Sequence, residues 1–350
     1  MTVHDGSAAS RHPYETLTPD VVLDALAGVG LIGDGRLMAL SSYENRVYQA
    51  HLEAAPDGVP PVVVAKFYRP GRWREAQVLE EHAFAADLMA AEVPAVGPLV
   101  LGGATLHRFG DFLFSVSPRR GGRQPELDDF EVLEWIGRFL ARLHAVGAQR
   151  PFVQRPAIDL AGFGTEPRDW LLAHDKIPLD VQSAWAARCQ EALDAIAACE
   201  GGALAGTAKA AAFRPLRLHG DCHPGNILWT PADVPGGGPH FVDLDDARTG
   251  PAVQDLWMLL SGECAQRNAQ LGALIDGYEQ FREFDRRELA LIEPLRTLRL
   301  IHYSAWLARR WDDPAFPAAF PWFGSSDYWK GQVLMLEEQL EAMAEPPLAA

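Results

Sequence analysis

Apolar and polar positions alternate along the first third of the chain in a pattern that favours a small sheet. Short runs rich in β-branched and aromatic residues are separated by turn-forming Gly, Pro and Asp, as in EAAPDGVPP between the second and third runs. Residues 72–91 are instead rich in Ala, Glu and Leu, which predicts one helix. The strands are expected at residues 36–40, 47–52, 62–68, 98–101 and 112–117. One helix packed on an antiparallel sheet makes this part of the chain an α+β lobe.

The pattern changes near residues 118–123, and from Asp128 onward it is helical over most of the chain. We therefore expect two lobes, the second larger and mostly helical. The expected segments are a disordered tail at 1–13, an N-lobe at 14–118 and a C-lobe at 119–345. Two stretches rich in Gly, Ala and Pro, at 201–211 and 231–239, are expected to be loops on either side of the densest motif.

Acidic side chains outnumber basic ones, since 47 Asp and Glu against 31 Lys and Arg give a formal charge of −16 for 350 residues. Such a surface repels phosphate backbones, so we expect no binding to nucleic acid or to anionic membranes. No apolar run reaches the roughly 20 residues that span a bilayer, and no signal-peptide pattern is present, which predicts a cytoplasmic protein. The four cysteines are scattered without a C-x-x-C pair, so neither a disulfide framework nor a zinc site is indicated.

The densest group of polar side chains lies in two short stretches, LRLHGDCHPGNILW at 216–229 and FVDLDD at 241–246. Apolar residues bracket each polar cluster, so each is expected at the end of a short buried strand. Asp221 and Asn226 have the spacing of the catalytic-loop Asp and Asn of protein kinases, and Asp243 stands in the place of a magnesium-binding aspartate. The pattern predicts phosphoryl transfer, with Asp221 acting on the acceptor hydroxyl and with Asn226 and Asp243 as oxygen ligands of Mg²⁺.

A rival interpretation treats the same polar side chains as the ligands of a dinuclear metallohydrolase. Its ligands would be His219, Asp221, His223, Asp243 and Asp245. That interpretation gives the first lobe no role, so we prefer phosphoryl transfer and expect His219 to organise the loop through hydrogen bonds. A single aspartate of this kind would be a turn or cap residue, and it is the combination of motifs that points to catalysis.

The first lobe supplies the other half of the expected site. The run VVVAKF places Lys66 inside an apolar strand. A lysine in such a strand needs an anionic partner, which nucleotide phosphates and a glutamate of the following helix would provide. Glu80 and Glu81 are the candidates, and we choose Glu81 because its helical spacing to Phe84 and Leu88 places it nearer the buried face.

The segment SSYEN between the first two strands occupies the place of the glycine-rich phosphate loop of a kinase, although it contains no glycine. Backbone N–H groups and the hydroxyls of Ser41 and Ser42 are suited to contact phosphates, and a plain turn is the alternative. The backbone near Ser115–Ser117 is expected to meet the adenine. Asp255, twelve residues after Asp243, is interpreted as structural, bracing the catalytic loop or capping a helix.

These motifs make the sequence similar to the stress-response kinase A family, in the aminoglycoside-phosphotransferase-like branch of the kinases. The resemblance runs from Leu17 to about Pro347. It is carried by NRVY at 45–48, VAKFYRP at 64–70, GGRQ at 121–124, LRLHGDCH at 216–223, GNILW at 225–229, FVDLDDAR at 241–248, GPAVQDLWMLL at 250–260 and DPAFP at 313–317.

The resemblance implies a monomeric, cytoplasmic Ser/Thr protein kinase that uses ATP and Mg²⁺ and acts in a stress response. It implies Asp221 as proton acceptor, Asn226 and Asp243 as magnesium ligands, and Ser42 as a residue on the ATP side. Relatives of this fold phosphorylate small alcohols and amino sugars, so a small-molecule kinase acting on an amino sugar, choline or a homoserine-like acceptor is the alternative. A pseudokinase that binds nucleotide without turnover is a third, weaker interpretation, because the expected catalytic residues are intact.

Overall fold

The computed structural model describes residues 12–199, 204 and 213–349, and two expectations fall largely outside this part of the chain. Of the tail predicted at 1–13 only the last two residues are described, and of the loop predicted at 201–211 only Leu204. The described residues form two compact units. Unit 1 comprises the chain up to Arg74 with Pro98–Arg119 and Arg310–Pro321, and unit 2 comprises Glu75–Gly97, Arg120–Arg309 and the chain from Trp322.

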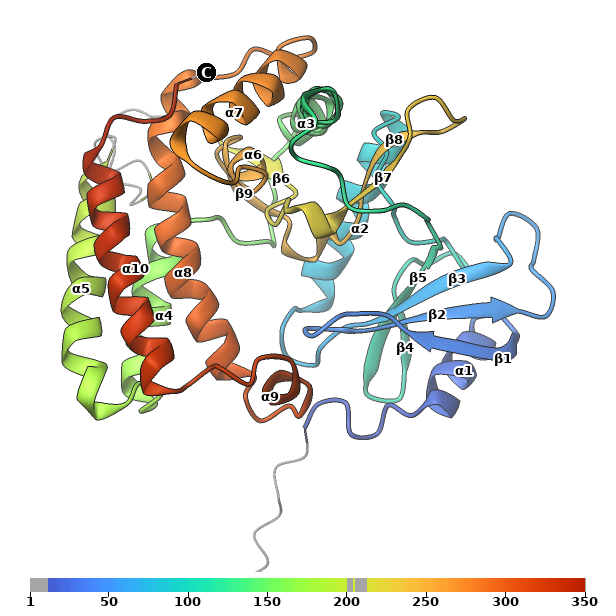
Figure 1. Cartoon of the computed structure of the whole chain (residues 1–350). Coiled ribbons are helices and arrows are strands. Elements are labelled where there is room, and N and C mark those ends of the chain that lie inside the picture. The colour runs from blue at the N-terminus through green and yellow to red at the C-terminus, as the bar shows by residue number, and fades with distance from the viewer. Residues whose placement is uncertain (1–11, 200–203, 205–212, 350) are drawn as a thin grey trace, which may run out of the picture. The chain divides into compact units, whose positions relative to one another are not determined.

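Unit 1 is built on a five-stranded antiparallel sheet with the order β1-β2-β3-β5-β4 (Figure 1). Its elements are α1 (Pro19–Gly28), β1 (Gly33–Ala39), β2 (Arg46–Leu52), β3 (Val62–Phe67), β4 (His107–Phe109), β5 (Phe112–Pro118) and α9 (Ala315–Ala319). Helix α1 begins after Thr18, whose hydroxyl accepts the N–H of Val21. The core joins α1 to the sheet through the buried side chains of Val22, Leu26, Val63, Phe67, Phe114 and Val116.

The strand predicted at residues 98–101 is wrong, and the fifth strand of the sheet is β4 instead. The N–H of Leu99 donates to the carbonyl of Val116 in β5 at 2.7 Å, but this single backbone hydrogen bond does not continue into a ladder. Strand β4 pairs with β5 across a two-residue turn in which Phe109 lies opposite Phe112 and Gly110 has a φ of 55°. A Gly-Asp turn between two aromatic residues is a hairpin signal, and it is the pattern from which this strand is predictable.

Unit 2 is mostly helical, as predicted, and its strands form two short antiparallel pairs, β6–β9 and β7–β8. Its helices are α2 (Glu75–Ala90), α3 (Phe130–Gly147), α4 (Glu166–Ala173), α5 (Leu179–Ala198), α6 (Gln254–Trp257), α7 (Cys264–Tyr278), α8 (Ile292–Arg309) and α10 (Ser326–Ala344). Its strands are β6 (Leu216–Leu218), β7 (Ile227–Thr230), β8 (Gly238–Phe241) and β9 (Arg248–Gly250). Among the described residues no helix is long and apolar enough to cross a membrane.

The helices of unit 2 pack in two groups, with α4, α5, α8 and α10 together and α3 against α7 (Figure 1). The close approach of α3 and α7 depends on glycine on both helices. A Cβ added at Gly137 or at Gly277 would lie 2.1 Å from a backbone carbonyl oxygen of the other helix. Any larger residue at either position therefore forces the two backbones apart.

Helix α2 belongs to unit 2, whereas the predicted lobe ranges place it with the sheet. The Glu80 carboxylate accepts the backbone N–H groups of residues 153–155 at 2.6–2.8 Å. Further along α2, Asp87 pairs with the buried Arg217 of β6 at 2.9 Å and with Arg150 at 2.6 Å. Charge-assisted bonds to backbone amides and a largely buried ion pair therefore fix this helix on the helical unit.

Glu288, in the 3-10 turn Arg286–Leu291, is a buried carboxyl whose Oε2 accepts the N–H of Val253 at 2.9 Å. Burial raises the pKa of this carboxyl from 4.5 to about 7. Between those values the folded chain holds a proton that the unfolded chain has lost. The contribution of Glu288 to the free energy of unfolding therefore falls as the pH rises through this window.

We predict that Glu288→Gln gains stability relative to the wild type as the pH is raised from about 5 to about 8, by up to about 3 kcal/mol. The glutamine retains an oxygen that accepts the Val253 N–H but carries no charge to desolvate. Urea unfolding at a series of pH values measures the difference. Glu338→Gln, at an exposed position of α10, is the matched control and should show no trend. If the difference in unfolding free energy between Glu288→Gln and the wild type does not change with pH, the prediction is contradicted.

Candidate active site

The loop after β6 carries the H-G-D motif and is held by one buried carboxylate. Asp255, in α6, accepts the backbone N–H groups of His219 and Gly220, each at 2.8 Å. Its Oδ2 also lies 3.1 Å from Nε2 of His144, whose Nδ1 lies 3.0 Å from the hydroxyl of Tyr278. Donors from two segments thus satisfy a carboxylate with no solvent exposure. Asp255 braces the loop, one of the two structural roles interpreted from the sequence.

The two residues before Asp221 shape this loop. Gly220 has a φ of +84°, and a Cβ there would lie 2.2 Å from the carbonyl oxygen of Asp246, so only glycine fits. His219 is fully buried, and its Nε2 lies 2.9 Å from the carbonyl oxygen of Val242. His219 is therefore the hydrogen-bonded loop organiser that the sequence suggests.

Asp221 presents a partly exposed carboxylate, with 22% of the side chain accessible. Its backbone carbonyl accepts the N–H of His223 and the Nδ2 group of Asn226, both at 2.9 Å. Its Oδ1 lies 2.6 Å from Nη1 of Arg299 on α8, and its Oδ2 lies 3.5 Å from Nε2 of His223. Burial lowers the pKa of His223, so the imidazole is neutral at pH 7 and Arg299 supplies the positive charge. Contacts at both oxygens give the carboxylate a defined direction.

The β7–β8 hairpin brings Asn226 and Asp243 to the same end of a short ladder. Ile227 of β7 is in register with Phe241 of β8, and the N–H of Val242 donates to the carbonyl of Asn226 at 3.0 Å. Asn226 thus precedes one strand and Asp243 follows the other. Asp243 is left-handed, with φ 59° and ψ 62°, an uncommon conformation for a non-glycine residue that clusters at functional sites.

An amide oxygen and a carboxylate at one end of a hairpin are hard donors of the kind that Mg²⁺ takes. Because Nδ2 of Asn226 is used on the loop backbone, its Oδ1 is the atom left to act as a ligand. Mg²⁺ is commonly held by one or two such ligands together with substrate phosphates, so this donor set fits. In the described part of the chain no group of three or more His, Cys, Asp or Glu side chains is placed to hold a metal ion. The dinuclear metallohydrolase interpretation lacks its ligand cluster there.

Lys66 lies in the centre of the unit 1 sheet, on β3, opposite Val47 of β2 and Ser115 of β5. Burial alternates along β3, and Lys66 lies on the half-buried face, away from the core face that carries Val63. Its Nζ is 5.2 Å from the centroid of the Tyr68 ring. A lysine on the half-buried face of a central strand is well placed to meet an anionic ligand.

Glu80 and Glu81 differ in what they contact within unit 2. Glu80 holds the three backbone amide groups described above. Glu81 is 6% exposed, and its Oε2 lies 3.7 Å from Nη1 of the buried Arg155, whose Nε donates to the carbonyl of Ala247 at 2.6 Å. Lys66 belongs to unit 1 and Glu81 to unit 2, and their pairing stays a prediction.

Ser42 lies in the loop between β1 and β2, and a buried ionic cluster holds the base of that loop. Glu44 pairs with Arg69 at 3.0 Å. Asp313 is 2% exposed and lies 2.8 Å from Nη2 of Arg46 and 2.5 Å from Nη2 of Arg69. Side chains from three distant parts of the sequence thus fix the backbone just after Ser42.

The same ionic cluster explains why residues 310–321 belong to unit 1 although the predicted ranges place them in the C-lobe. Arg310 pairs with Glu44 at 2.5 Å, and the Phe316 ring centroid lies 5.5 Å from the guanidinium of Arg69. Residues of the motifs NRVY, VAKFYRP and DPAFP meet in this cluster.

Three residues that organise the candidate site were not predicted from the sequence. They are Arg155, which joins Glu81 to the segment after Asp243, Arg299, which holds Asp221, and Asp313. Only Asp313 lies in a motif that the sequence displays, DPAFP. The partners of the other two are far away in the sequence, so no local spacing marks them.

A sheet unit with a lysine on its third strand, together with a helical unit that carries a D-x-x-x-x-N loop, defines a protein-kinase-like α+β phosphotransferase fold, which implies the use of ATP. The model of the "Phosphotransferase enzyme family" matches residues 37–292. The chain is 46% identical over 339 residues to Stress response kinase A of Escherichia coli (strain K12), covering 97% of each chain. It is 45% identical over 335 residues to Serine/threonine protein kinase RdoA of Salmonella typhimurium (strain LT2), covering 96% of each. The chain belongs to the phosphotransferase enzyme family and, within it, to the stress response kinase A family.

Two solved structures have the same fold. One is the amicoumacin kinase hAmiN in complex with AMP-PNP, Ca²⁺ and Ami, with a TM-score of 0.67 and 18% identity over 94% of each chain. The other is a microcompartment-associated aminopropanol kinase, with a TM-score of 0.66 and 18% identity over 93% of this chain and 98% of that one. At this identity the two structures support the fold alone.

We predict that Asp255→Asn lowers the rate of phosphoryl transfer from ATP roughly 10- to 100-fold. An amide nitrogen then replaces one of the two carboxylate oxygens that accept hydrogen bonds, and the H-G-D loop shifts. Nucleotide affinity should change little. Steady-state turnover and calorimetric nucleotide binding measure the two effects. Asp276→Asn, at an exposed position of α7, is the control and should behave as the wild type. Unchanged turnover in a folded Asp255→Asn protein would show that the loop does not need this brace.

Proposed function

We propose that this chain is an ATP- and Mg²⁺-dependent Ser/Thr protein kinase that acts in a stress response. The observation that carries the proposal is 45% identity over 96% of each chain to a relative named Serine/threonine protein kinase RdoA. The match spans both units and every motif described above. The expected monomeric state is part of this proposal.

In this proposal Asp221 accepts the proton of the acceptor hydroxyl. Arg299 and His223 hold its carboxylate and Asp255 holds its loop, so the direction of the base is set before the acceptor binds. Asn226 and Asp243 would hold the Mg²⁺. When bound, that ion neutralises charge on the phosphate oxygens of ATP.

The residues of unit 1 act on the nucleotide in this proposal. Lys66 binds the α- and β-phosphates, and Glu81 pairs with Lys66. Ser42 contacts phosphate through its hydroxyl or its backbone, and the backbone at Ser115–Ser117 meets the adenine. The central position of Lys66 and the ionic cluster at the base of the Ser42 loop support these roles.

The second candidate is a kinase that phosphorylates a hydroxyl of an amino sugar, choline or a homoserine-like molecule. The observation in its favour is that the solved structures sharing this fold include kinases named for amicoumacin and aminopropanol. The same residues would do the same chemistry, and only the acceptor would differ. A nucleotide-binding pseudokinase is the weaker third candidate.

Incubation with labelled ATP and Mg²⁺ separates the candidates. One arm contains the protein alone, a second adds a generic basic protein, and a third adds a panel of small alcohols that includes choline, homoserine and amino sugars. Label on protein Ser or Thr supports the protein-kinase proposal. Label confined to small molecules overturns it and leaves the phosphotransferase chemistry intact. Nucleotide binding without transfer in any arm identifies a pseudokinase.

We predict that Asp221→Asn lowers turnover by about 10²- to 10⁴-fold, because the amide cannot accept the hydroxyl proton. Nucleotide affinity should stay within about twofold, since the carboxylate acts on the acceptor. Measuring kcat together with the dissociation constant of ATP distinguishes the two effects. Asp233→Asn, in the exposed turn between β7 and β8, is the control. Near wild-type turnover would remove Asp221 from the role of base.

We predict that Asp243→Ala weakens the productive Mg²⁺–ATP complex and raises the Mg²⁺ concentration needed for half-maximal activity by at least about tenfold, because a hard ligand is lost. Asp245→Ala is the matched variant two residues away. Asp245 is buried, so its loss should lower stability and leave the Mg²⁺ dependence unchanged. A Mg²⁺ titration of activity with a thermal melt of each variant measures both. If Asp245→Ala raises the Mg²⁺ requirement and Asp243→Ala does not, Asp245 is the metal ligand instead.

A further inference from the structure

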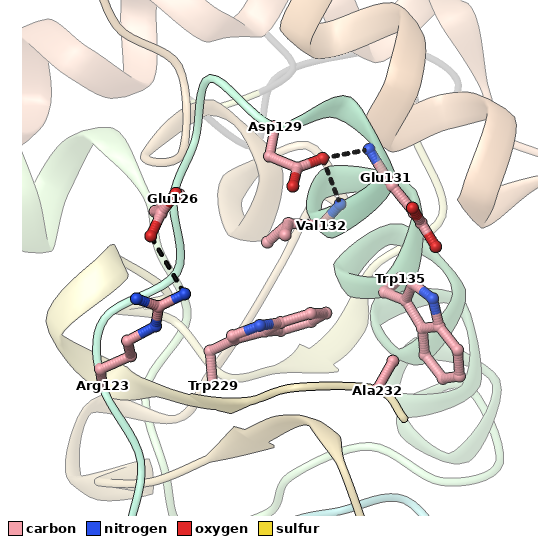
Figure 2. Close-up of a pocket in the computed structure, with 8 residues that line it drawn as sticks. All are labelled: Arg123, Glu126, Asp129, Glu131, Val132, Trp135, Trp229 and Ala232. Carbon is pink, nitrogen blue, oxygen red and sulfur yellow. Dashed lines mark hydrogen bonds and ion pairs between the residues drawn. The ribbon is translucent and has the colours of Figure 1, made fainter. Parts of the chain in front are cut away.

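A cavity of about 160 Å³ lies in unit 2 beside the start of α3 and the β7–β8 hairpin. None of its lining residues has a role in the phosphoryl-transfer site proposed above. In Figure 2 the Trp229 indole extends along one side of the cavity, Trp135 lies at another, and the carboxyl groups of Asp129 and Glu131 lie around it. Two aromatic walls and acidic groups around one small cavity are the elements of a site for a cation with an apolar stem.

The backbone fixes the two aromatic walls in place. Arg123 and Trp229 exchange backbone hydrogen bonds of 3.0 and 2.7 Å, which tie the segment before α3 to β7. Trp229 is 6% exposed, so its ring cannot swing away. Opposite Trp135 stands Gly238, where a Cβ would lie 3.5 Å from the ring. The cavity therefore belongs to the folded frame of unit 2.

The charges around the cavity leave an excess of negative charge. Glu126, Asp129 and Glu131 supply three carboxylates, and Arg123 supplies one guanidinium. The Asp129 carboxylate caps α3 through its Oδ1, which accepts the N–H groups of Glu131 and Val132. The Arg123–Glu126 pair, at 3.0 Å, is 66% and 64% exposed, so it contributes little and exchanges readily.

We propose that this cavity is a docking pocket for one lysine or arginine side chain of a protein partner. Small-molecule sites commonly enclose about 300–1,000 Å³, so a cavity of about 160 Å³ suits a single long side chain better than a whole metabolite. The indole rings cover the alkyl stem, and the carboxylates pair with the charged end. The formal charge of −16 attracts a basic partner over longer distances.

The docking pocket also gives a role to GGRQ, a motif that the proposed phosphoryl transfer leaves unused, and to the last residue of GNILW. Arg123 belongs to GGRQ at 121–124, and Trp229 is the last residue of GNILW at 225–229. The proposal does not depend on the identity of the acceptor, because binding at this pocket is measured without ATP.

The test is a titration of the full chain, labelled with ¹⁵N, with a short peptide that carries one arginine, followed through the indole N–H signals of Trp135 and Trp229. The same peptide with citrulline in place of arginine is the control ligand, since it keeps the shape and removes the charge. We expect saturable shifts of these two signals with the arginine peptide and none with the citrulline peptide. The Trp135→Leu variant assigns the Trp135 signal and should weaken binding about five- to tenfold.

Charge reversal at the rim separates the pocket from the general attraction of an acidic protein. Glu131→Arg should lower the affinity for the arginine peptide about tenfold. Glu338→Arg makes the same charge change at an exposed position of α10 and should lower the affinity for this peptide less than about twofold. Equal losses in both variants, or equal shifts with the citrulline peptide, overturn the proposal.

Discussion

The rest of the candidate site depends on the hydrogen bonds that the buried Asp255 carboxylate accepts from the H-G-D loop. This carboxylate has no contact with solvent, and its acceptor capacity is used on the backbone of the H-G-D loop and on His144. The four-residue helix that carries it is itself held by Glu288, through the N–H of Val253. Two buried carboxyl groups in succession thus support the loop that carries the partly exposed carboxylate of Asp221, so a change at either is expected to displace that carboxylate.

Local motifs predicted the chemistry of the site because phosphoryl transfer constrains short spacings. The separation of Asp221 from Asn226 and the position of Asp243 after a strand follow from one loop and one hairpin, so a single stretch of sequence contains them. The strands of the sheet were also predictable from local sequence patterns, except that a strand was expected at residues 98–101 and β4 forms instead. Residues 98–101 have the apolar composition of a strand but no partner ladder, and β4 is three residues long and depends on its turn.

Ion pairs between residues far apart in the sequence could not be predicted from local sequence patterns. Arg299 and Arg155 stand in ordinary surroundings, and only the fold shows that one contacts Asp221 and the other Glu81. The assignment of α2 to unit 2 has the same origin, because amphipathic spacing says which face of a helix is buried but not which neighbour covers it. The left-handed conformation of Asp243 likewise has no signature of its own in the sequence.

The anchoring of α2 has a consequence for how this enzyme can be controlled. In protein kinases the helix with the lysine-pairing glutamate is a common regulatory element, because it swings between positions that complete or dismantle the nucleotide site. Here α2, the helix that carries the glutamate proposed to pair with Lys66, is held on the helical unit by three hydrogen bonds from backbone N–H groups to Glu80 and by the ion pair of Asp87 with Arg217. Detaching it costs several kcal/mol, above the roughly 1–3 kcal/mol by which an effector typically couples two sites. An effector of typical strength is therefore too weak to detach α2 from the helical unit.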